Sequence, residues 1–464
     1  MRVLHVSWGF SPWLGGGLVA YTEGVMAGQA ARGHDVAAFL AGRHLPLYRR
    51  PFVRRRRWSG VTVHELVNAP IAQHWSAGTL HPGRDLDEPE TERHFAAVLA
   101  RVAPEVVHFQ HLAGLPSSLI GLASGAGART VMTLEDYQPL CPTLKLYDSH
   151  GLICLRRDVA AECARCCAQA PADAAHLVDQ TVRFELVRGK QRIPGLRRLS
   201  LGRAGHAIGG VPGRALRTGG GPRPAAPAEY QRRREINLAR LGAVDRLIAQ
   251  SPRVAEIYRG LGVAHPRLCT LQLTLAHIEH LNPRRLDAPP RPVTFATLNG
   301  AASPAKGAEL LLEASRRLAG ERFRLLVFGQ VHAAIAGALA GTPGVELRGP
   351  YTARELDGLL DEVDVGIVPS VWEEAYGYVG PELLAKGIPV IGNALGGIVE
   401  YTRDGETGWL NRSASAEELA RHMRTAIRRP EEVLALHREV LARRSELIKP
   451  MARHLEELEG VYTS

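Results

Sequence analysis

The chain has 464 residues, of which 45% are hydrophobic and 22% are charged. This ordinary globular composition excludes a disordered, collagen-like or fibrous protein, and the length predicts two or three domains. No run of about eighteen apolar residues is present, so we expect no transmembrane helix. The first residues lack the pattern of a secretory signal, which leads us to expect a cytoplasmic protein.

Basic residues outnumber acidic residues by 57 to 47, and the formal net charge is +10. Only five of the basic residues are lysines: Lys145, Lys190, Lys306, Lys386 and Lys449. The excess charge favours anionic ligands such as phosphates, or peripheral contact with an acidic membrane surface. Because no nucleic-acid-binding motif accompanies the charge, we expect no nucleic acid partner.

The N-terminal part of the chain alternates short apolar runs with helical segments, which is typical of a doubly wound α/β sheet. Residues 2–7 predict a buried parallel strand. A glycine-rich turn, a helix over 19–31 and a strand over 36–40 follow. Further strands are predicted over three segments: 106–109, 130–134 and 245–251. The last of these ends at Ser251, a good helix N-cap before Pro252.

The same alternation starts again after residues 281–293, a proline-rich segment that we interpret as a hinge between two domains. A helix is predicted over residues 306–319, and a long polar helical stretch over 431–460 ends the chain. The strands predicted in this part are 293–298, 323–328, 345–347, 365–368 and 390–391.

Two other segments depart from this alternation. Residues 186–228 are rich in Arg, Gly and Pro, and they form either a mobile linker or a loop that docks on a membrane or an acceptor. Residues 141–167 contain five of the six cysteines. Four thiolates are the number that a structural zinc site needs, and free buried thiols are the alternative. The candidate ligands are Cys141, Cys154, Cys163 and Cys166.

The segment 364–410 contains two glutamates, Glu374 and Glu382, with seven residues between them. Pro381 suits the first position of a helix, which would put Glu382 in the first helical turn. Free backbone N–H groups at such a turn bind anions, and carboxylates accept hydrogen bonds from sugar hydroxyls. The segment therefore predicts a sugar-phosphate site. The loop between the glutamates contains Tyr376, Gly377 and Tyr378.

This segment resembles the E-x7-E donor-site signature of the retaining glycosyltransferases of family 4, which have the GT-B fold. The resemblance covers nearly the whole chain and is strongest over residues 295–410. It implies two Rossmann-like, doubly wound parallel-sheet domains that face each other across a cleft. It also implies that Glu374 binds the transferred sugar in catalysis, that Glu382 holds the nucleotide ribose, and that residues 376–378 bind phosphate or sugar.

The turn from Gly300 to Gly307 resembles the family turn in which an arginine and a lysine clamp the diphosphate of the donor. Lys306 matches the lysine, which implies a catalytic and donor-binding role for its charge. Ala301 stands where the family has the arginine. The clamp is therefore one charge short, unless an arginine from elsewhere reaches the site.

Gly16 and Gly17 resemble the family's glycine-rich turn, where the backbone approaches the donor diphosphate from the N-terminal domain. The turn is not a G-x-G-x-x-G motif, and no acidic residue ends the second strand, which weakens a nicotinamide-dependent alternative. The family also has a histidine near the acceptor and the reacting sugar. We assign this role to His111 and internal packing to His108; the alternative is that neither contacts a ligand.

Glu135, Asp136 and Tyr137 follow the next predicted strand. Because the carboxyl ends of parallel strands meet at one sheet edge, these residues can bind acceptor hydroxyls there. The alternative is a capping or solvated acidic turn.

The resemblance implies an acceptor-binding domain over residues 1–285, which includes the two unusual segments described above. It implies a nucleotide-sugar-binding domain over residues 286–435. Residues 436–464 are expected to form a helix that crosses back to the N-terminal domain.

The implied activity is transfer of a sugar from a nucleotide sugar, most commonly a UDP-sugar in this family, to a hydroxyl acceptor with retention of configuration. Such an enzyme acts in natural-product, glycolipid or polysaccharide biosynthesis. The resemblance implies no cofactor for catalysis, because the leaving diphosphate itself helps to deprotonate the acceptor. Two alternatives are a weakly active or non-catalytic nucleotide-sugar-binding protein and another GT-B enzyme, such as a sugar-nucleotide epimerase.

Overall fold

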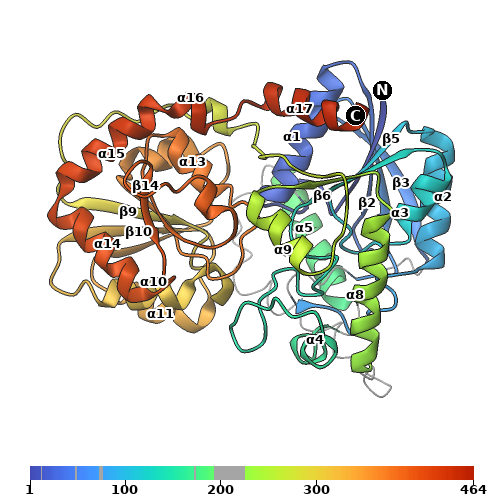
Figure 1. Ribbon diagram of the computed structural model, residues 1–464, viewed down its shortest axis with the longest axis horizontal. Coiled ribbons are helices and arrows are strands. Elements are labelled where there is room, and N and C mark those ends of the chain that lie inside the picture. Colours follow the sequence, from blue (N-terminus) through green and yellow to red (C-terminus); the bar gives the residue numbers. More distant parts are fainter. Residues whose placement is uncertain (12, 47–49, 73–76, 172–173, 193–224) are drawn as a thin grey trace.

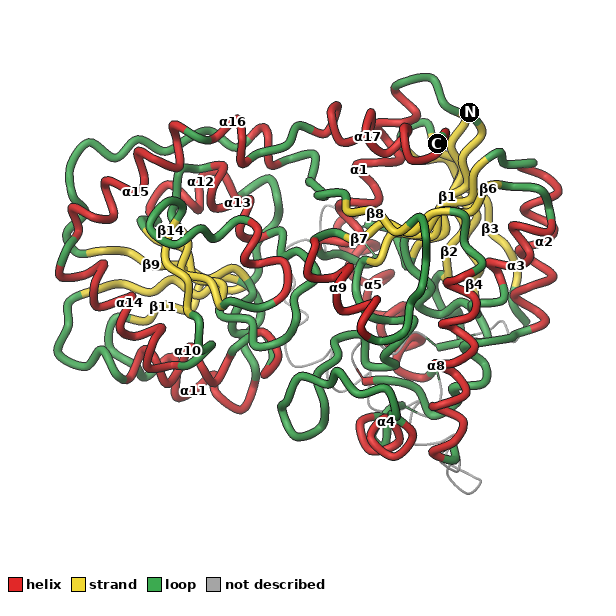
Figure 2. Tube along the Cα trace, in the orientation of Figure 1, coloured by secondary structure: helices red, strands yellow, loops and turns green. Residues whose placement is uncertain are grey.

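Two parallel sheets, one in each half of the molecule, form the framework of this computed structural model (Figure 1). Figure 2 shows helices on both sides of each sheet. The structure describes residues 1–11, 13–46, 50–72, 77–171, 174–192 and 225–464. None of the described helices is long and apolar enough to cross a membrane.

The N-terminal sheet has the strand order β3-β4-β2-β1-β5-β6-β7-β8, and only β3 runs antiparallel to its neighbour. Its strands are β1 (Arg2–Ser7), β2 (Asp35–Ala41), β3 (Phe52–Trp58), β4 (Val61–Val67), β5 (Val106–Phe109), β6 (Arg129–Leu134), β7 (Arg246–Ala249) and β8 (Leu268–Thr270). Its helices are α1 (Gly17–Ala31), α2 (Pro89–Val102), α3 (Leu119–Gly125), α4 (Ala160–Cys166), α5 (Ala175–Arg192), α8 (Pro227–Gly242) and α9 (Pro252–Gly260).

The C-terminal sheet has the order β11-β10-β9-β12-β13-β14, and all of its strands are parallel. Its strands are β9 (Val293–Leu298), β10 (Phe323–Phe328), β11 (Val345–Gly349), β12 (Val365–Val368), β13 (Val390–Asn393) and β14 (Gly408–Asn411). Its helices are α10 (Ala308–Arg316), α11 (Ala333–Ala340), α12 (Leu356–Leu359), α13 (Val379–Ala385) and α14 (Ala416–Arg428). The predicted pair of doubly wound α/β domains is thus confirmed.

The structure differs from the sequence predictions at one helix and at one edge strand. The helix expected over 306–319 is divided into a short 3₁₀ turn, Pro304–Lys306, and α10, because Gly307 between them has a left-handed φ of 90°. β3 was not predicted, since its sequence FVRRRRW contains four consecutive arginines. An edge strand tolerates such charges because one of its sides has no partner strand.

Most of the segment 186–228 lies outside the described residues, and its described ends belong to α5 and α8.

The last part of the chain is not one long helix, as predicted over 431–460, but three: α15 (Pro430–Ala442), α16 (Arg444–Leu447) and α17 (Met451–Thr463). Pro450 accounts for the final break, because a proline disfavours helical backbone in the residue before it. Figure 1 shows α16 and α17 leading from the C-terminal domain to the N-terminal domain, where α17 packs against α1. The chain therefore crosses between the domains a second time.

Buried polar contacts hold α17 to the N-terminal domain. Tyr21 of α1 hydrogen-bonds His454 of α17 through its hydroxyl and Nε2, at 2.9 Å. The Tyr462 hydroxyl lies 2.7 Å from Nδ1 of His108 in β5 and accepts a hydrogen bond from Gln29 Nε2 at 3.2 Å. Because buried polar groups are costly without partners, these contacts select one position for α17.

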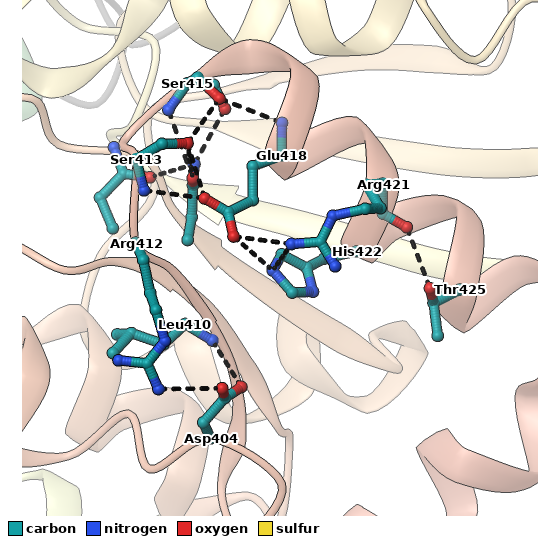
Figure 3. Close-up of polar contacts among 11 residues, drawn as sticks. Asp404, Leu410, Arg412, Ser413, Ser415, Glu418, Arg421, His422 and Thr425 are labelled. Atoms are coloured by element: carbon teal, nitrogen blue, oxygen red, sulfur yellow. Dashed lines mark hydrogen bonds and ion pairs between the residues drawn. The ribbon is translucent and has the colours of Figure 1, made fainter.

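The start of α14 shows how local sequence defines a helix end in the C-terminal domain (Figure 3). Ser415 is the N-cap, and its hydroxyl accepts a hydrogen bond from the backbone N–H of Glu418 at 3.2 Å. The Glu418 carboxylate accepts hydrogen bonds from the backbone N–H of Ser413 at 2.8 Å and from Arg421 at 2.6 Å. The S-x-x-E spacing is a capping signal, and here it anchors the turn that follows β14.

The buried histidines predict that stability falls in mild acid. Burial lowers the pKa of His5 and of His454 from 6.5 to about 4. Between these values the unfolded chain binds protons that the folded chain does not, so stability is lost as the pH falls. Each histidine contributes a slope of about 1.4 kcal/mol per pH unit. We expect H454Q to show a shallower loss than the wild type in urea unfolding between pH 7 and pH 5. Identical slopes would contradict this prediction.

Candidate active site

A cavity of about 770 Å³ lies between the two domains. The N-terminal domain contributes the turn at residues 15–17 before α1 and residues 135–136 after β6. The C-terminal domain contributes residues 298–300 at the end of β9, Lys306, and much of the segment 367–382, which starts at the end of β12. Parallel sheets place ligand-contacting residues at the carboxyl ends of their strands. In both sheets, the cavity residues named above lie at or beyond those ends. The volume suits a ligand of cofactor size.

The glycine turn permits close contact between the domains. Gly16 has a φ of 108°, a conformation that glycine adopts readily. A Cβ on Gly17 would lie 2.4 Å from the ring of Tyr378 in the C-terminal domain. Both glycines line the cavity, as does Gly300 on the opposite side. The structure thus brings together the two predicted glycine turns.

Lys306 and Glu374 form an ion pair in the wall of the cavity. Lys306 Nζ lies 2.9 Å and 2.8 Å from the two carboxylate oxygens of Glu374. The same carboxylate accepts hydrogen bonds from the Ser370 hydroxyl at 2.9 Å and from Trp372 Nε1 at 3.0 Å. Four donor contacts therefore satisfy Glu374 in this conformation, and a ligand that binds either member has to compete with the pair.

The backbone around Glu374 is held by the loop after β13. Gly397 donates its N–H to the carbonyl oxygen of Glu374 at 2.7 Å, and a Cβ on Gly396 would lie 2.0 Å from that oxygen. The preceding residue, Glu373, accepts the N–H of Gly396 at 2.8 Å and pairs with Arg253 of α9 at 2.5 Å. The two adjacent glutamates therefore have different partners, and only Glu374 lines the cavity.

Glu382 lines the cavity from the first turn of α13. The helix starts at Val379, two residues before the start that Pro381 predicted, so Pro381 is the third helical residue rather than the first. Proline is tolerated there because the first turn needs no intrahelical N–H bond. A carboxylate oxygen of Glu382 lies 2.8 Å from Nε2 of His277, which belongs to the segment between β8 and β9.

Tyr376, Gly377 and Tyr378, which lie between the glutamates, also line the cavity. Tyr376 is buried, and its hydroxyl accepts a hydrogen bond from Gln272 Nε2 at 2.5 Å. Gly377 has a φ of 80°, which turns the chain into α13. Tyr378 stacks on Tyr21 of α1, with ring centroids 6.4 Å apart. This loop is therefore a contact between the domains as well as a wall of the cavity.

The predicted acceptor-side residues divide into two groups. Glu135 and Asp136 line the cavity. His111 is only 2% exposed and lies behind Asp136. Its Nδ1 accepts the N–H of Ala113 at 3.0 Å, so Nε2 carries the proton and donates it to Asp136 at 3.0 Å. Tyr137 is fully buried against Tyr258 and outside the cavity wall.

Glu135 has an unusual environment for a carboxyl group. Burial, and then the charge of neighbouring Asp136, raises its pKa well above the usual value. Gln250 donates a hydrogen bond to it at 2.6 Å. A protonated carboxyl can donate a hydrogen bond to a ligand, whereas Asp136 beside it can accept one.

The cysteines make no metal site among the residues that the structure describes, where no three His, Cys, Asp or Glu side chains are grouped as ligands. Cys141 contacts the Thr143 hydroxyl at 3.2 Å, and Cys166 donates to Glu162 at 3.7 Å. Burial raises the pKa of Cys166 to about 11 and that of Cys163 further, which favours thiols over thiolates. The zinc site therefore stays a prediction from the spacing, without support from this geometry.

Two cavity residues whose side chains can carry positive charge were missed in the sequence analysis. His277 has no local signal, because it lies in an irregular segment and reaches Glu382 only through the fold. Lys145 lines the cavity from the cysteine-rich segment. Its signal was present, since lysine is rare in this arginine-rich chain.

Residues 292–429 match the family described as glycosyl transferases group 1. The match includes Lys306, Glu374 and Glu382, so the C-terminal side of the cavity lies in the matched segment, which we term the group 1 domain after this match. A curated relative is the D-inositol 3-phosphate glycosyltransferase of Streptomyces bingchenggensis, 31% identical over 253 residues. The alignment covers 49% of this chain and 53% of that protein, so the chain spans about half the length of this relative.

Solved structures resemble the whole chain. Sucrose-phosphate synthase from Thermosynechococcus elongatus superposes with a TM-score of 0.62 and 15% identity, over 99% of this chain and 98% of that chain. HepE of Anabaena, solved with UDP and glucose, superposes with a TM-score of 0.59 and 12% identity, over the full length of both chains. At these identities the likeness concerns the fold alone, and that fold is GT-B.

The Lys306–Glu374 pair yields a prediction about stability. We expect K306M and E374Q each to lower the free energy of unfolding by about 1–3 kcal/mol, because each leaves a half-buried partner unpaired. The double variant K306M/E374Q should lose about 1–2 kcal/mol less than the sum of the single losses. Urea unfolding of the four proteins measures this coupling.

The exposed pair Arg317–Glu313 is the matched control for this cycle. Its coupling should be only about 0.3–0.5 kcal/mol, as for other ion pairs on helix surfaces. Additive effects of K306M and E374Q would contradict the pair as a stabilising contact.

Proposed function

We propose that the protein is a family 4 glycosyltransferase that transfers a sugar from a nucleotide sugar, a UDP-sugar in the first instance, to a hydroxyl acceptor with retention of configuration. The observation that carries this proposal is that one interdomain cavity is lined by Lys306, Glu374 and Glu382 of the group 1 domain and by the glycine turn at 15–17. A binding site shared by two domains also lets domain closure exclude water from a reactive donor.

The cavity residues supply groups for each part of such a donor. Lys306 can bind the diphosphate, and Glu382 can accept hydrogen bonds from the ribose hydroxyls. Binding of phosphate to Lys306 would release Glu374, which then becomes an acceptor for hydroxyls of the transferred sugar. The ion pair at 2.8 Å is therefore a resting arrangement that a donor exchanges for its own contacts.

In the proposed reaction, the bond between the sugar C1 and the diphosphate oxygen breaks, and a bond from C1 to the acceptor oxygen forms on the same face. The acceptor proton passes to an oxygen of the leaving diphosphate. Negative charge develops on that diphosphate, and the ammonium of Lys306 stabilises it. The role of this chain is thus mainly to position the reactants and to compensate charge.

The acceptor belongs on the side of the N-terminal domain. Asp136 is oriented by the proton on His111 Nε2, and it can accept a hydrogen bond from the attacking hydroxyl. Glu135, whose raised pKa favours the protonated form, can donate one to another acceptor oxygen. In this proposal His111 is a positioning residue that acts through Asp136.

The names of similar proteins support this choice of substrates. HepE was solved with UDP and glucose, and a curated relative is named a D-inositol 3-phosphate glycosyltransferase. The decisive experiment incubates the purified protein with a panel of nucleotide sugars and candidate acceptors and detects the products by mass spectrometry. NMR of the product then gives its anomeric configuration. An inverted product would contradict retention, and binding of nucleoside diphosphates without turnover would favour the non-catalytic alternative.

We expect K306A to lower kcat by roughly 10²–10³-fold, the usual effect of removing one electrostatic stabiliser of a transition state. The thermal unfolding midpoint, measured beside the kinetics, separates this loss from unfolding. A folded K306A variant with wild-type kcat would contradict the assignment of Lys306.

We expect E382A to weaken UDP binding by about 10- to 100-fold, since a hydrogen bond to a charged group contributes roughly 1.5–3 kcal/mol. E374A should mainly lower kcat, because its partner is the reacting sugar. Calorimetric titration with UDP and steady-state kinetics distinguish the two effects. E417A, which removes an exposed glutamate on α14, is the matched control and should change neither.

A further inference from the structure

Lys145 enters the interdomain cavity from the N-terminal domain, opposite the group 1 domain that contains Lys306. It belongs to the cysteine-rich segment, between Cys141 and Cys154. Both lysines line the same cavity, and nothing in the motifs of the sequence assigns a role to Lys145. Its position on the far wall makes it a second source of positive charge for a ligand at Lys306.

The backbone on both sides of Lys145 is in an unfavourable conformation. Leu144 has a φ of 72° and Leu146 a φ of 49°, both in the left-handed region. For residues other than glycine this conformation costs about 1–2 kcal/mol each, and it persists only where surrounding contacts enforce it. Such strain is concentrated at functional sites.

Surrounding contacts hold both leucines in place. The Leu144 carbonyl accepts the N–H of Tyr137 at 3.0 Å, and the Leu146 carbonyl accepts the N–H of Cys154 at 2.7 Å. Leu144 packs with Trp8 at one end of the N-terminal core, and Leu146 is 1% exposed in the main core of that domain. With a buried anchor on either side, Lys145 has little freedom to leave the cavity wall.

Three other lysines, whose side chains the structure describes, have carboxylate partners. Lys306 pairs with Glu374, Lys386 with Asp357 and Asp361, and Lys449 with Glu457. Lys145 has no hydrogen bond or ion pair with any residue that the structure describes. A half-buried ammonium without a partner is costly, so a bound anion would stabilise it.

The electrostatic surroundings of Lys145 point to the same region of the cavity. Burial lowers its pKa, and the positive charge of Lys306 lowers it further, whereas Glu374 and Asp136 partly oppose this effect. Lys145 therefore lies within electrostatic range of the ion pair in the cavity wall. Two cations that repel each other across a cavity are stabilised together by an anion of two or more charges between them.

The turn from Gly300 to Gly307 contains one cation, Lys306. Ala301 stands where the resembling family has an arginine, and its methyl group is fully buried in the core of the C-terminal domain. We propose that Lys145 replaces that arginine as the second cation of the diphosphate clamp, so that the clamp is completed across the cavity by the N-terminal domain. This inference rests on the proposed function, because it names the part of the donor that Lys145 binds.

A clamp divided between the domains has a consequence for specificity. A diphosphate bound by Lys306 and Lys145 ties the two domains together, whereas a monophosphate satisfies one cation at most. We therefore expect affinity for UDP to exceed affinity for UMP, and we expect Lys145 to account for much of the difference. In this proposal, the function of the strained cysteine-rich segment is to hold Lys145 in place for ligand binding.

The test compares wild type, K145M and K145R by calorimetric titration with UDP and with UMP at fixed ionic strength. K145M should bind UDP about 10- to 100-fold more weakly, as expected for loss of a charge-assisted contact, and UMP within threefold of wild type. K145R should recover much of the UDP affinity because it restores the charge. R93M, which removes an exposed cation from α2, controls for net charge and should bind UDP as wild type does.

Stability provides a second readout that a merely structural role would not produce. Removal of a desolvated, unpaired ammonium should leave the thermal midpoint of K145M unchanged or raise it, while UDP affinity falls. A lower midpoint together with weaker binding of both nucleotides would overturn the clamp role in favour of a structural one.

The remaining outcomes separate this inference from the proposed function. If wild type binds UDP and K145M binds it within twofold of wild type, Lys145 is not part of the clamp and the proposed function stands. If wild type binds no nucleoside diphosphate, the proposed function itself fails. A titration with inorganic phosphate at saturating UDP tests whether Lys145 binds a phosphate of the acceptor instead. If K145M loses affinity only in that titration, Lys145 binds the acceptor, and the donor-clamp assignment is overturned.

Discussion

Three carboxylates within ten residues, Glu373, Glu374 and Glu382, are buried where the two domains meet, and each requires a positively charged or hydrogen-bonding partner. Lys306 of the same domain pairs with Glu374. Arg253 of α9 pairs with Glu373, and His277 from the connection after β8 contacts Glu382. Two of the three partners thus lie outside the C-terminal sheet domain. The need to compensate buried charge therefore links the interior of the C-terminal domain to the rest of the chain.

The cavity follows from this link and from the strand polarity of the two sheets. Both sheets present the carboxyl ends of their strands to the interface, so loops rather than strand edges line the space between them. The second crossing of the chain adds a constraint, because α17 is held to α1 and β5 through Tyr21, His108 and buried partners. A cavity bounded in this way has polar groups from both domains. Such a cavity suits a ligand in which a charged group joins two polar groups.

The local sequence pattern was sufficient to predict a strand or helix wherever one physical signal dominated. The apolar runs at β5, β9, β10 and β12 gave strands with the predicted bounds, because burial on both faces requires uninterrupted apolar residues. β3 was missed because the hydrophobic signal is absent from an arginine-rich edge strand. The final helical stretch was predicted as one element because its composition is uniform, whereas a single proline determines where α17 begins.

The sequence by itself determined the α/β alternation, the two glutamates, Lys306 and the glycine turns, because each of these is encoded by neighbouring residues. Only the tertiary structure decided that His111 lies behind Asp136, that Glu373 and Glu374 have different partners, and that Lys145 reaches the same cavity as Lys306. These relations join residues far apart in the chain. They depend on desolvation and on distance, which are properties of the folded packing and not of any local stretch of sequence.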